Sequence, residues 1–293
     1  MSSTTYVPKV LTIAGSDSGG GAESRDLKTF TTLSVYGTSV ITAITAQNTL
    51  GVQDVHPLPI PAITSQLRSV LTDIPIDAAK TGMLFDAATI TAVCRTLNEY
   101  RVPNLVVDPV MVATSGDVLL AHDAVSAMVE SLFPLATVVT PNVPEAERLV
   151  GFPVKSVEDM RSAARALHGL MGGGDAGRAR WALVKGGHMP LDAEGRAVGS
   201  GGESAPVVVL DVLFDGTEFV EFRNPFVRTR NTHGTGCTLS AAIVAGLAKG
   251  FDVPKAVADA MTFLAKAIST TFPVGSGSGP LNHFHQPDSV AEP

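Results

Sequence analysis

Residues 231–239, with the sequence NTHGTGCTL, bring together several residue types that could bind a ligand or take part in a reaction. Gly234 and Gly236 flank Thr235, and Cys237 follows directly before an alanine-rich apolar run that is typical of a buried helix. Glycines let a backbone approach a ligand closely, and the free N–H groups of a helix start attract anions. A cysteine there is expected to have a lowered pKa. The stretch predicts an anion hole bearing a base or nucleophile; a plain glycine loop with a small buried cysteine stays open.

Short apolar strands alternate with segments of helical periodicity along most of the chain. The pattern predicts strands at residues 10–14, 40–46, 76–79, 105–107, 137–140 and 182–184. It predicts helices at residues 22–35, 63–72, 87–100, 123–132, 157–171, along the apolar run after Cys237, and at 254–272. Two β-rich runs around Asp215-Gly216, within residues 207–226, predict a hairpin. We therefore expect one α/β domain over residues 1–293 with a mostly parallel sheet, and loose tails at about 1–8 and 286–293.

Polar or glycine residues follow directly after the predicted strands. These groups are residues 15–17, 47–48, 80–82, Asp108, Asn142 with Glu145, and 185–187. Each group alone fits ordinary turn chemistry. Ligands of open parallel sheets bind at the carboxyl ends of the strands, however. Six groups at corresponding positions therefore favour one shared site.

Two of these groups suit the binding of phosphate and metal. Asn142 and Glu145 stand three residues apart, so at the start of a helix both could face one way, and a carboxylate there can hold water on Mg²⁺. The same pair also fits a capping box, and that interpretation stays open. Lys185 follows a strand and precedes two glycines, a position that suits neutralising a phosphate.

Charge and motifs exclude several classes of protein. The formal net charge of −7 and the lack of any Lys/Arg run argue against a nucleic-acid partner. The chain contains no GxxxxGK[ST], and its GxGxxG match at residues 172–177 follows a helix instead of a strand, so we interpret it as a loop. His283 and His285 are not expected to bind a metal.

The chain has neither a signal peptide nor an apolar stretch of about 18 residues, so no membrane association is expected. Its two cysteines, Cys94 and Cys237, lie too far apart in sequence to suggest a disulfide framework. These features predict a reduced, cytoplasmic protein.

Nine segments together resemble one known family. They are IAGSDSGGGA, DLKTF, VITAITAQNT, KTGML, VVDPVM, TPNVPEA, VKGGH, NTHGTGCTLSAAI and GPLNHFH, in this order between about Val10 and His285. The chain resembles the hydroxymethylpyrimidine/phosphomethylpyrimidine kinases of thiamine biosynthesis, which have the ribokinase-like three-layer α/β/α fold. The resemblance implies an ATP- and Mg²⁺-dependent kinase, with K⁺ as a further candidate ion. Its acceptors would be 4-amino-5-hydroxymethyl-2-methylpyrimidine and then the monophosphate, and family members are commonly homodimers.

The resemblance also implies roles for individual residues. The backbone of Gly234, Thr235 and Gly236 would form the anion hole for the transferring phosphoryl group, and Cys237 would take the proton of the substrate hydroxyl. The residues that match the family's pyrimidine pocket are Gly15, Asp26, Gln47, Met83 and Val110. The residues that match its nucleotide and metal side are Asn142 and Lys185 for the nucleotide, and Glu145 and Asp108 for the metal.

One segment departs from the family pattern. Where the family reads GGAGIQADLK or close to it, residues 20–28 read GGAESRDLK, one residue shorter. One deletion in a helix rotates all later residues of that helix by about 100°. Either the glycines before Ala22 absorb the slip, or Asp26 no longer faces the pocket, and Arg25 is a candidate to crowd it. The deletion leaves open a weakly catalytic sensor that binds pyrimidine or vitamin B6. A pyridoxal or pyridoxine kinase is the other alternative, because related proteins use the same fold and cysteine-bearing loop for that ring.

Overall fold

A nine-stranded sheet forms the middle of the fold in the computed structural model, which describes residues 6–111, 123–172, 179–198, 205–229, 231 and 234–285. The strand order is β3-β2-β1-β4-β5-β6-β7-β8-β9. The strands are β1 (Lys9–Asp17), β2 (Tyr36–Asn48), β3 (Gly51–Pro57), β4 (Ala78–Thr81), β5 (Leu105–Val107), β6 (Val138–Val139), β7 (Trp181–Val184), β8 (Val208–Phe214) and β9 (Phe219–Pro225).

The α-helices of the described ranges are α1 (Ala22–Thr32), α2 (Ile60–Leu71), α3 (Ala87–Glu99), α4 (Ala124–Ala127), α5 (Val143–Val150), α6 (Val157–Leu170), α7 (Thr235–Ala248) and α8 (Val253–Ser269). A π-helical turn at Met128–Leu132 and two 3₁₀ turns, at Phe133–Leu135 and Gly186–His188, complete the helical segments. None of these helices is both long and apolar enough to cross a membrane. Most of the GxGxxG match and the C-terminal tail lie outside the described residues.

The centre of the sheet is parallel and its edges are antiparallel. β2, β1, β4, β5, β6 and β7 run parallel, whereas β3, β8 and β9 pair antiparallel. The predicted hairpin is confirmed: β8 and β9 meet at Asp215, whose Oδ1 accepts hydrogen bonds from the N–H groups of Thr217 and Glu218 at 2.7 Å. The predicted three-layer α/β fold with a mostly parallel sheet is therefore confirmed.

The sequence did not predict β3. We expected Gln47-Asn48 to end a strand and a proline-rich connection to come next, but β2 turns directly into β3. β3 is an edge strand whose side chains are exposed or half-buried. Edge strands are often polar, and GVQDVHP lacks the apolar run that signals a buried strand.

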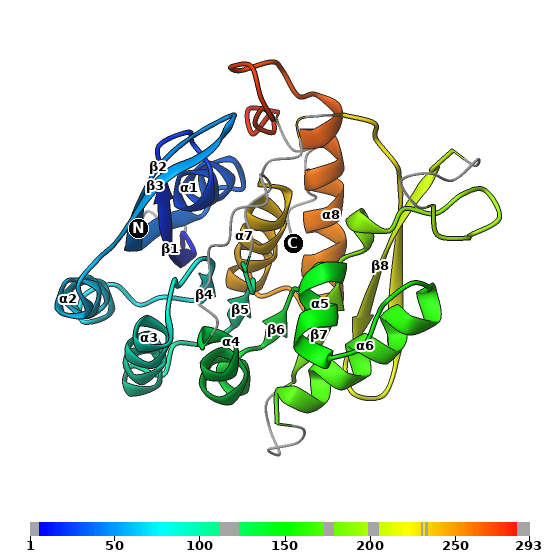
Figure 1. Ribbon diagram of the computed structural model, residues 1–293. Helices are drawn as coiled ribbons and strands as arrows, with labels where there is room; N and C mark the ends of the chain where they lie inside the picture. Colours follow the sequence, from blue (N-terminus) through cyan, green and yellow to red (C-terminus); the bar gives the residue numbers. More distant parts are fainter. Residues whose placement is uncertain are drawn as a thin grey trace, which may run out of the picture.

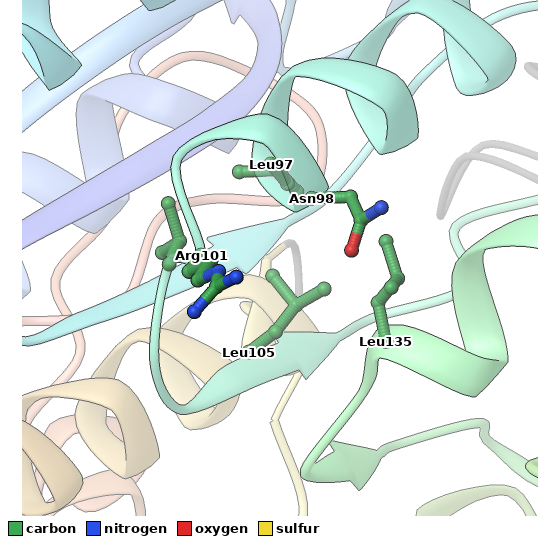
Figure 2. Close-up of a pocket in the computed structure, with 6 residues that line it drawn as sticks. Leu97, Asn98, Arg101, Leu105 and Leu135 are labelled. Atoms are coloured by element: carbon green, nitrogen blue, oxygen red, sulfur yellow. The ribbon is translucent and has the colours of Figure 1, made fainter.

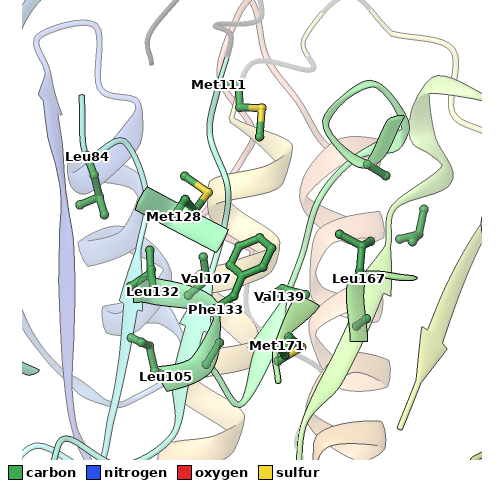
Figure 3. Close-up of a cluster of buried hydrophobic side chains, with 14 of the residues drawn as sticks. Leu84, Leu105, Val107, Met111, Met128, Leu132, Phe133, Val139, Leu167 and Met171 are labelled. Carbon is green, nitrogen blue, oxygen red and sulfur yellow. The ribbon is translucent and has the colours of Figure 1, made fainter. Parts of the chain in front are cut away.

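Two helical layers cover the sheet, as Figure 1 shows. α1, α7 and α8 pack on one face, and α2, α3, α5 and α6 on the other. Side chains at alternate positions of the parallel strands point to opposite faces of the sheet and pack into the two hydrophobic cores. Leu105 and Val107 of β5, for example, point into the larger cluster with Leu132, Phe133 and Val139 (Figure 3).

α7 is the central helix of its layer and lies beside both α1 and α8 (Figure 1). Residues 238–247 are all buried, as an apolar run without a polar face requires. Gly246 permits the close approach of α8, because a Cβ there would lie 2.9 Å from that of Ala256. The chain thus fixes the position of the N-terminus of α7 firmly against the sheet.

Candidate active site

Three charged side chains stand near the carboxyl ends of parallel strands. Lys80 lies in β4, Asp108 directly follows β5, and Lys185 directly follows β7. The residues two positions earlier in each segment belong to the core under α1, α7 and α8. Because side chains alternate along a strand, all three charges face that same helical layer. The sheet thus gathers them next to the N-terminus of α7.

The GTGC segment forms the N-terminus of α7. Gly234 is the N-cap residue, with φ +81°, in the left-handed region that favours glycine. A Cβ at this position would lie 2.6 Å from Cδ of Arg25 and would overlap its guanidinium, so space also demands glycine. No described side chain caps the helix. The N–H groups of its first turn, at residues 235–237, therefore face outward as anion donors.

An ion pair lies directly against the second glycine of this segment. Lys185 Nζ is 2.9 Å from Asp108 Oδ1, and both groups are largely buried. A Cβ at Gly236 would lie 3.1 Å from Lys185 Nζ and 3.4 Å from Asp108 Oδ2. Thr140 and Ser240 place their hydroxyls 3.4 Å from the Asp108 oxygens. The cation of Lys185 is thus held where a phosphate on the N–H groups of α7 would need it.

Glu145 forms the capping box that the sequence offered as one interpretation. Its carboxylate accepts from the Asn142 N–H at 2.8 Å, and Asn142 Oδ1 accepts from the Glu145 N–H at 2.9 Å. Burial raises the pKa of Glu145 to about 7; Lys185 opposes this shift and Asp108 adds to it. An isolated parallel β-bridge between the backbones of Asn142 and Lys185 links this helix start to the ion pair. The carboxylate therefore belongs to the same cluster.

Glu145→Gln is expected to stabilise the ligand-free protein above neutral pH. Because the folded-state pKa is about 7 against an ordinary 4.5, Glu145 costs the protein stability as pH rises from about 4.5 to 7, and this loss persists at higher pH. At about 1.4 kcal/mol per unit, the variant should gain up to about 3 kcal/mol at pH 8 and little at pH 4. Urea unfolding at both pH values measures this. Glu158→Gln changes an exposed carboxylate on α6 and serves as the control; an equal response in both variants would contradict the assignment.

The prediction of a lowered pKa for Cys237 is wrong. Burial raises the pKa of the thiol to about 11; Lys80 opposes the shift, Asp26 and Asp108 reinforce it, and Arg25 opposes it. The residue keeps partial exposure, yet the sulfur is enclosed by protein, and that environment decides the direction. The sequence suggested the favourable helix start but not the depth at which the thiol lies. At neutral pH Cys237 is therefore a thiol and not a thiolate.

The residues predicted for the acceptor pocket lie around the ends of β1, β2 and β4. Gly15 is packed on Met83: a Cβ there would lie 3.1 Å from the Met83 sulfur. Gln47 is half-buried, and its backbone N–H and C=O both bond the Ser18 hydroxyl, at 2.9 and 2.7 Å. Val110 follows Asp108 and donates its N–H to the carbonyl of Asp108 at 2.8 Å. The order in which the chain adds strands reverses between β1 and β4, which is the topological switch point at which α/β sheets bind ligands.

Asp26 lies beneath the site and not at its surface. It is fully buried, and its carboxylate accepts from Lys80 Nζ at 2.9 Å and from the Thr12 hydroxyl at 2.6 Å. Burial raises the pKa of Asp26 against the opposing pull of Lys80. Burial acts to lower the pKa of Lys80, but Asp26 and the other acidic neighbours together outweigh it and raise the pKa, so the amine stays protonated. Lys80 and Asp26 therefore form a buried ion pair, which lies close enough to Cys237 to affect its pKa.

Two residues with left-handed backbone lead the chain into α1. Gly20 has φ +84°, and Ala22, which is not glycine, has φ +43°. Ala22 also bridges back to Ser16, which holds the helix start against β1. From there α1 turns Asp26, Thr29 and Phe30 into the interior. Within the shortened segment, Asp26 faces Lys80 and Thr12 in the interior, and Arg25 lies against Gly234.

Sequence reasoning missed several residues of the site. Thr12, Thr140 and Ser240 hold Asp26 and Asp108 by their hydroxyls, and Lys80 was noted only as part of a strand-end group. Lys80 carried a usable signal, because a lysine within a short apolar strand must find a buried anion. The three hydroxyls carried none, since Thr and Ser suit strands and buried helices equally well.

One cavity among the described residues lies away from this cluster. It has a volume of about 330 Å³ and is lined by Leu97, Asn98, Arg101, Leu105 and Leu135, among others (Figure 2). Leu105 begins β5, whereas Asp108 follows its end. This pocket therefore lies at the amino ends of the strands, opposite the carboxyl ends that carry the charged cluster. The described residues also contain no group of three or more His, Cys, Asp or Glu that could hold a metal ion. His283 instead pairs with the Thr238 hydroxyl at 3.0 Å.

Known proteins resemble the chain over nearly its full length. Residues 17–282 match the family described as phosphomethylpyrimidine kinase. The chain is 44% identical to the hydroxymethylpyrimidine/phosphomethylpyrimidine kinase of Bacillus subtilis, over 94% of each chain. It is 48% identical to the thiamine biosynthesis bifunctional protein of Geobacter sulfurreducens, over 97% of this chain but only 54% of that protein. The chain thus spans about half the length of this bifunctional relative.

Solved structures agree with the fold. The ADP complex of Bacillus subtilis pyridoxal kinase superposes with a TM-score of 0.79 at 37% identity, covering 95% of this chain and 98% of that one. The strand-end cluster and the GTGC helix start lie within residues 17–282. By the extent of this match and the identity to the curated kinases, the chain belongs to the phosphomethylpyrimidine kinase family.

Proposed function

We propose that the protein transfers the γ-phosphoryl group of ATP to the hydroxyl of 4-amino-5-hydroxymethyl-2-methylpyrimidine, and then a second one to the resulting monophosphate. The observation that carries the proposal is the uncapped N-terminus of α7, with Lys185 and Asp108 packed against Gly236. Preorganised N–H groups and a fixed cation stabilise the negative charge of a transferring phosphoryl group. The family's relatives bear names that describe this chemistry.

In the first transfer the hydroxyl oxygen attacks the γ-phosphorus, and the bond to the β-phosphate oxygen breaks as ADP leaves. The N–H groups of Gly236 and its neighbours receive the phosphoryl oxygens. Cys237 takes the hydroxyl proton, which requires the small thiolate fraction, since burial raises its pKa to about 11. In the second transfer a phosphate oxygen is the nucleophile. It is already ionised near pH 7 and needs no base.

The carboxylates of Glu145 and Asp108 suit Mg²⁺, which prefers oxygen ligands and usually takes one or two carboxylates beside the substrate phosphates. The raised pKa of Glu145, caused by burial, indicates a carboxylate whose ionised form lacks enough positive charge around it. When bound, Mg²⁺ would neutralise charge on the phosphate oxygens. Lys185 and Asn142 hold the nucleotide side of the same cluster. The proposal also includes K⁺ as a further ion, a homodimeric assembly and a cytoplasmic location.

Pyridoxal kinase is the second candidate. Its support is structural, because pyridoxal kinases of two organisms superpose with TM-scores of 0.79 and 0.80. Gln47 and Met83 would bind either ring, since an amide pairs with ring polar groups and a thioether packs on any aromatic face. The match of residues 17–282 to the phosphomethylpyrimidine kinase family and the 44% identity to the pyrimidine kinase of Bacillus subtilis favour the pyrimidine.

Separate assays with each acceptor test the proposal. Purified protein with ATP and Mg²⁺ is given the hydroxymethylpyrimidine, its monophosphate or pyridoxal, and ADP formation is followed. We expect kcat/KM for the pyrimidine to exceed that for pyridoxal by at least about tenfold, since one mismatched polar group is worth about 1–3 kcal/mol. A preference for pyridoxal would establish the second candidate. Binding without turnover of any acceptor would indicate a sensor instead.

A further inference from the structure

Arg25 is the largest side chain that the described part of the protein buries completely. It retains 1% exposure, and its Nε and Nη1 find no hydrogen-bond partner among the described residues. Burying polar donors without partners costs roughly 1–3 kcal/mol each, and more for a charged group. Asp17 and Asp26 attract the guanidinium electrostatically, and this offsets part of the cost. The remaining donors suit an anionic ligand.

The guanidinium lies on the N-terminus of α7. A Cβ at Gly234 would overlap Nη1 and Cζ, so the group is in direct contact with the N-cap residue of that helix. α7 is 14 residues long and has no described side-chain cap. Two independent sets of unsatisfied donors, the N–H groups of a helix start and the N–H groups of a buried arginine, therefore meet at one place. Both favour a negatively charged ligand.

Arg25 and Lys185 lie against different glycines of the GTG turn. Lys185 comes from β7 and packs on Gly236, whereas Arg25 comes from α1 and packs on Gly234. α1 follows β1, the strand that carries Gly15 of the acceptor pocket. The site thus has one cation on the nucleotide side and a second on the acceptor side. A hydroxyl acceptor has no charge for the second cation to neutralise, but a phosphorylated acceptor does.

We propose that Arg25 is a phosphate-binding residue on the acceptor side of the anion hole, and that it serves the transfer in which the acceptor is itself a phosphomonoester. In that transfer an acceptor phosphate oxygen forms a bond to the γ-phosphorus of ATP, and the bond to the β-phosphate oxygen breaks with ADP as the leaving group. Two anions must come together, and Arg25 offsets their repulsion. This inference rests on the proposed function for its reaction, but not for the binding of phosphate.

Three variants separate the charge of Arg25 from its bulk. Arg25→Gln removes the charge, Arg25→Lys keeps it, and Lys28→Gln removes an exposed charge one turn further along α1 as the matched control. Inorganic phosphate and the pyrimidine monophosphate, each without nucleotide, are titrated by calorimetry. We expect Arg25→Gln to bind both about 10- to 100-fold more weakly, the range for losing a charge-assisted hydrogen bond. Arg25→Lys should recover part of the loss, and Lys28→Gln should bind as the parent does.

Kinetics supply the selective readout. Arg25→Gln should lower kcat/KM for the monophosphate about 10- to 100-fold while changing that for the hydroxymethylpyrimidine by less than about threefold. The ligand-free variant should also unfold at the same or a higher temperature, since an unsatisfied buried charge has been removed. A purely structural arginine would lower the unfolding temperature and both activities together, which would overturn the proposal.

Two other results would contradict the proposal. If Arg25→Gln binds phosphate as tightly as the parent, Arg25 does not contact the ligand. If the variant turns over the hydroxymethylpyrimidine faster and binds phosphate equally well, Arg25 is an obstruction and not a receptor. Should no variant turn over any pyrimidine, the proposed function fails, yet phosphate binding would still decide whether Arg25 is an anion receptor.

Discussion

Cys237→Ala is expected to lower kcat for the hydroxymethylpyrimidine by about 10²- to 10⁴-fold, the usual contribution of a general base. The N-terminus of α7 and Lys185 remain in place in this variant, so acceptor binding should change little. The monophosphate should be affected far less, by under about tenfold, because its phosphate oxygen loses no proton when it attacks. Steady-state kinetics with each acceptor measure this difference.

The pH profile identifies the base. Because burial raises the pKa of Cys237 to about 11, the thiolate fraction is about 10⁻⁴ at pH 7 and grows tenfold per pH unit. For the hydroxyl acceptor, kcat should therefore rise with near-unit slope from pH 6.5 to 9, wherever proton transfer limits the rate. Cys237→Asp supplies a carboxylate of lower pKa and should flatten that slope. A parent profile that is level over this range would exclude the thiolate as base.

The second cysteine offers the matched control. Cys94 is buried in the larger core, where burial raises its pKa to about 12, and it lies in α3, on the face of the sheet away from α7. Cys94→Ala should keep kcat for both acceptors within about twofold, at some cost in stability from the small cavity. Equal losses of kcat in both cysteine variants would indicate a general structural effect and not base catalysis.

Lys80→Met is expected to destabilise the protein by about 3–5 kcal/mol, the cost of leaving one member of a buried ion pair without its partner. Lys80 and Asp26 have fully buried side chains 2.9 Å apart, and after the substitution only the Thr12 hydroxyl would contact the carboxylate. Because burial then raises the pKa of Asp26 further, the loss should shrink as pH falls and the carboxylate takes up a proton. Urea unfolding at pH 7.5 and pH 5 measures both effects.

The chain contains a matched exposed pair for comparison. Lys255 and Asp259 are also 2.9 Å apart, but at the surface of α8. Lys255→Met should cost less than about 1 kcal/mol. The double variant Lys80→Met with Asp26→Asn should be more stable than the sum of the single losses, since no unpaired charge remains. Equal costs for Lys80→Met and Lys255→Met would contradict the assignment of a buried ion pair.

The parts of the fold that the sequence predicted are those with a strong apolar period. The buried strand at 105–107 and the helix after Cys237 are examples, because only burial explains such uninterrupted apolar runs. β3 was missed for the converse reason. It is an edge strand with half-exposed side chains, so its pairing with β2 depends on a partner strand and leaves no local apolar pattern.

The same distinction between predictable and unpredictable features applies to the candidate active site. The strand-end positions of Asp108 and Lys185 could be predicted because topology alone brings strand ends together. The pKa of Cys237 could not, because it depends on how much protein surrounds the sulfur and on the distances to Lys80 and Arg25. The path of Arg25 could not be predicted either. It depends on the strained backbone at Ala22, which only the folded loop shows.

Phosphorus NMR of a single reaction tests the central claim most directly. The protein is mixed with ATP, Mg²⁺ and the hydroxymethylpyrimidine, and Cys237→Ala is run in parallel. We predict that the parent forms the pyrimidine monophosphate and then the diphosphate, with one ADP for each step. Cys237→Ala should fail to form the monophosphate but convert added monophosphate to the diphosphate. ADP and free phosphate without either pyrimidine ester, or unimpaired first transfer by Cys237→Ala, would contradict this assignment of the site.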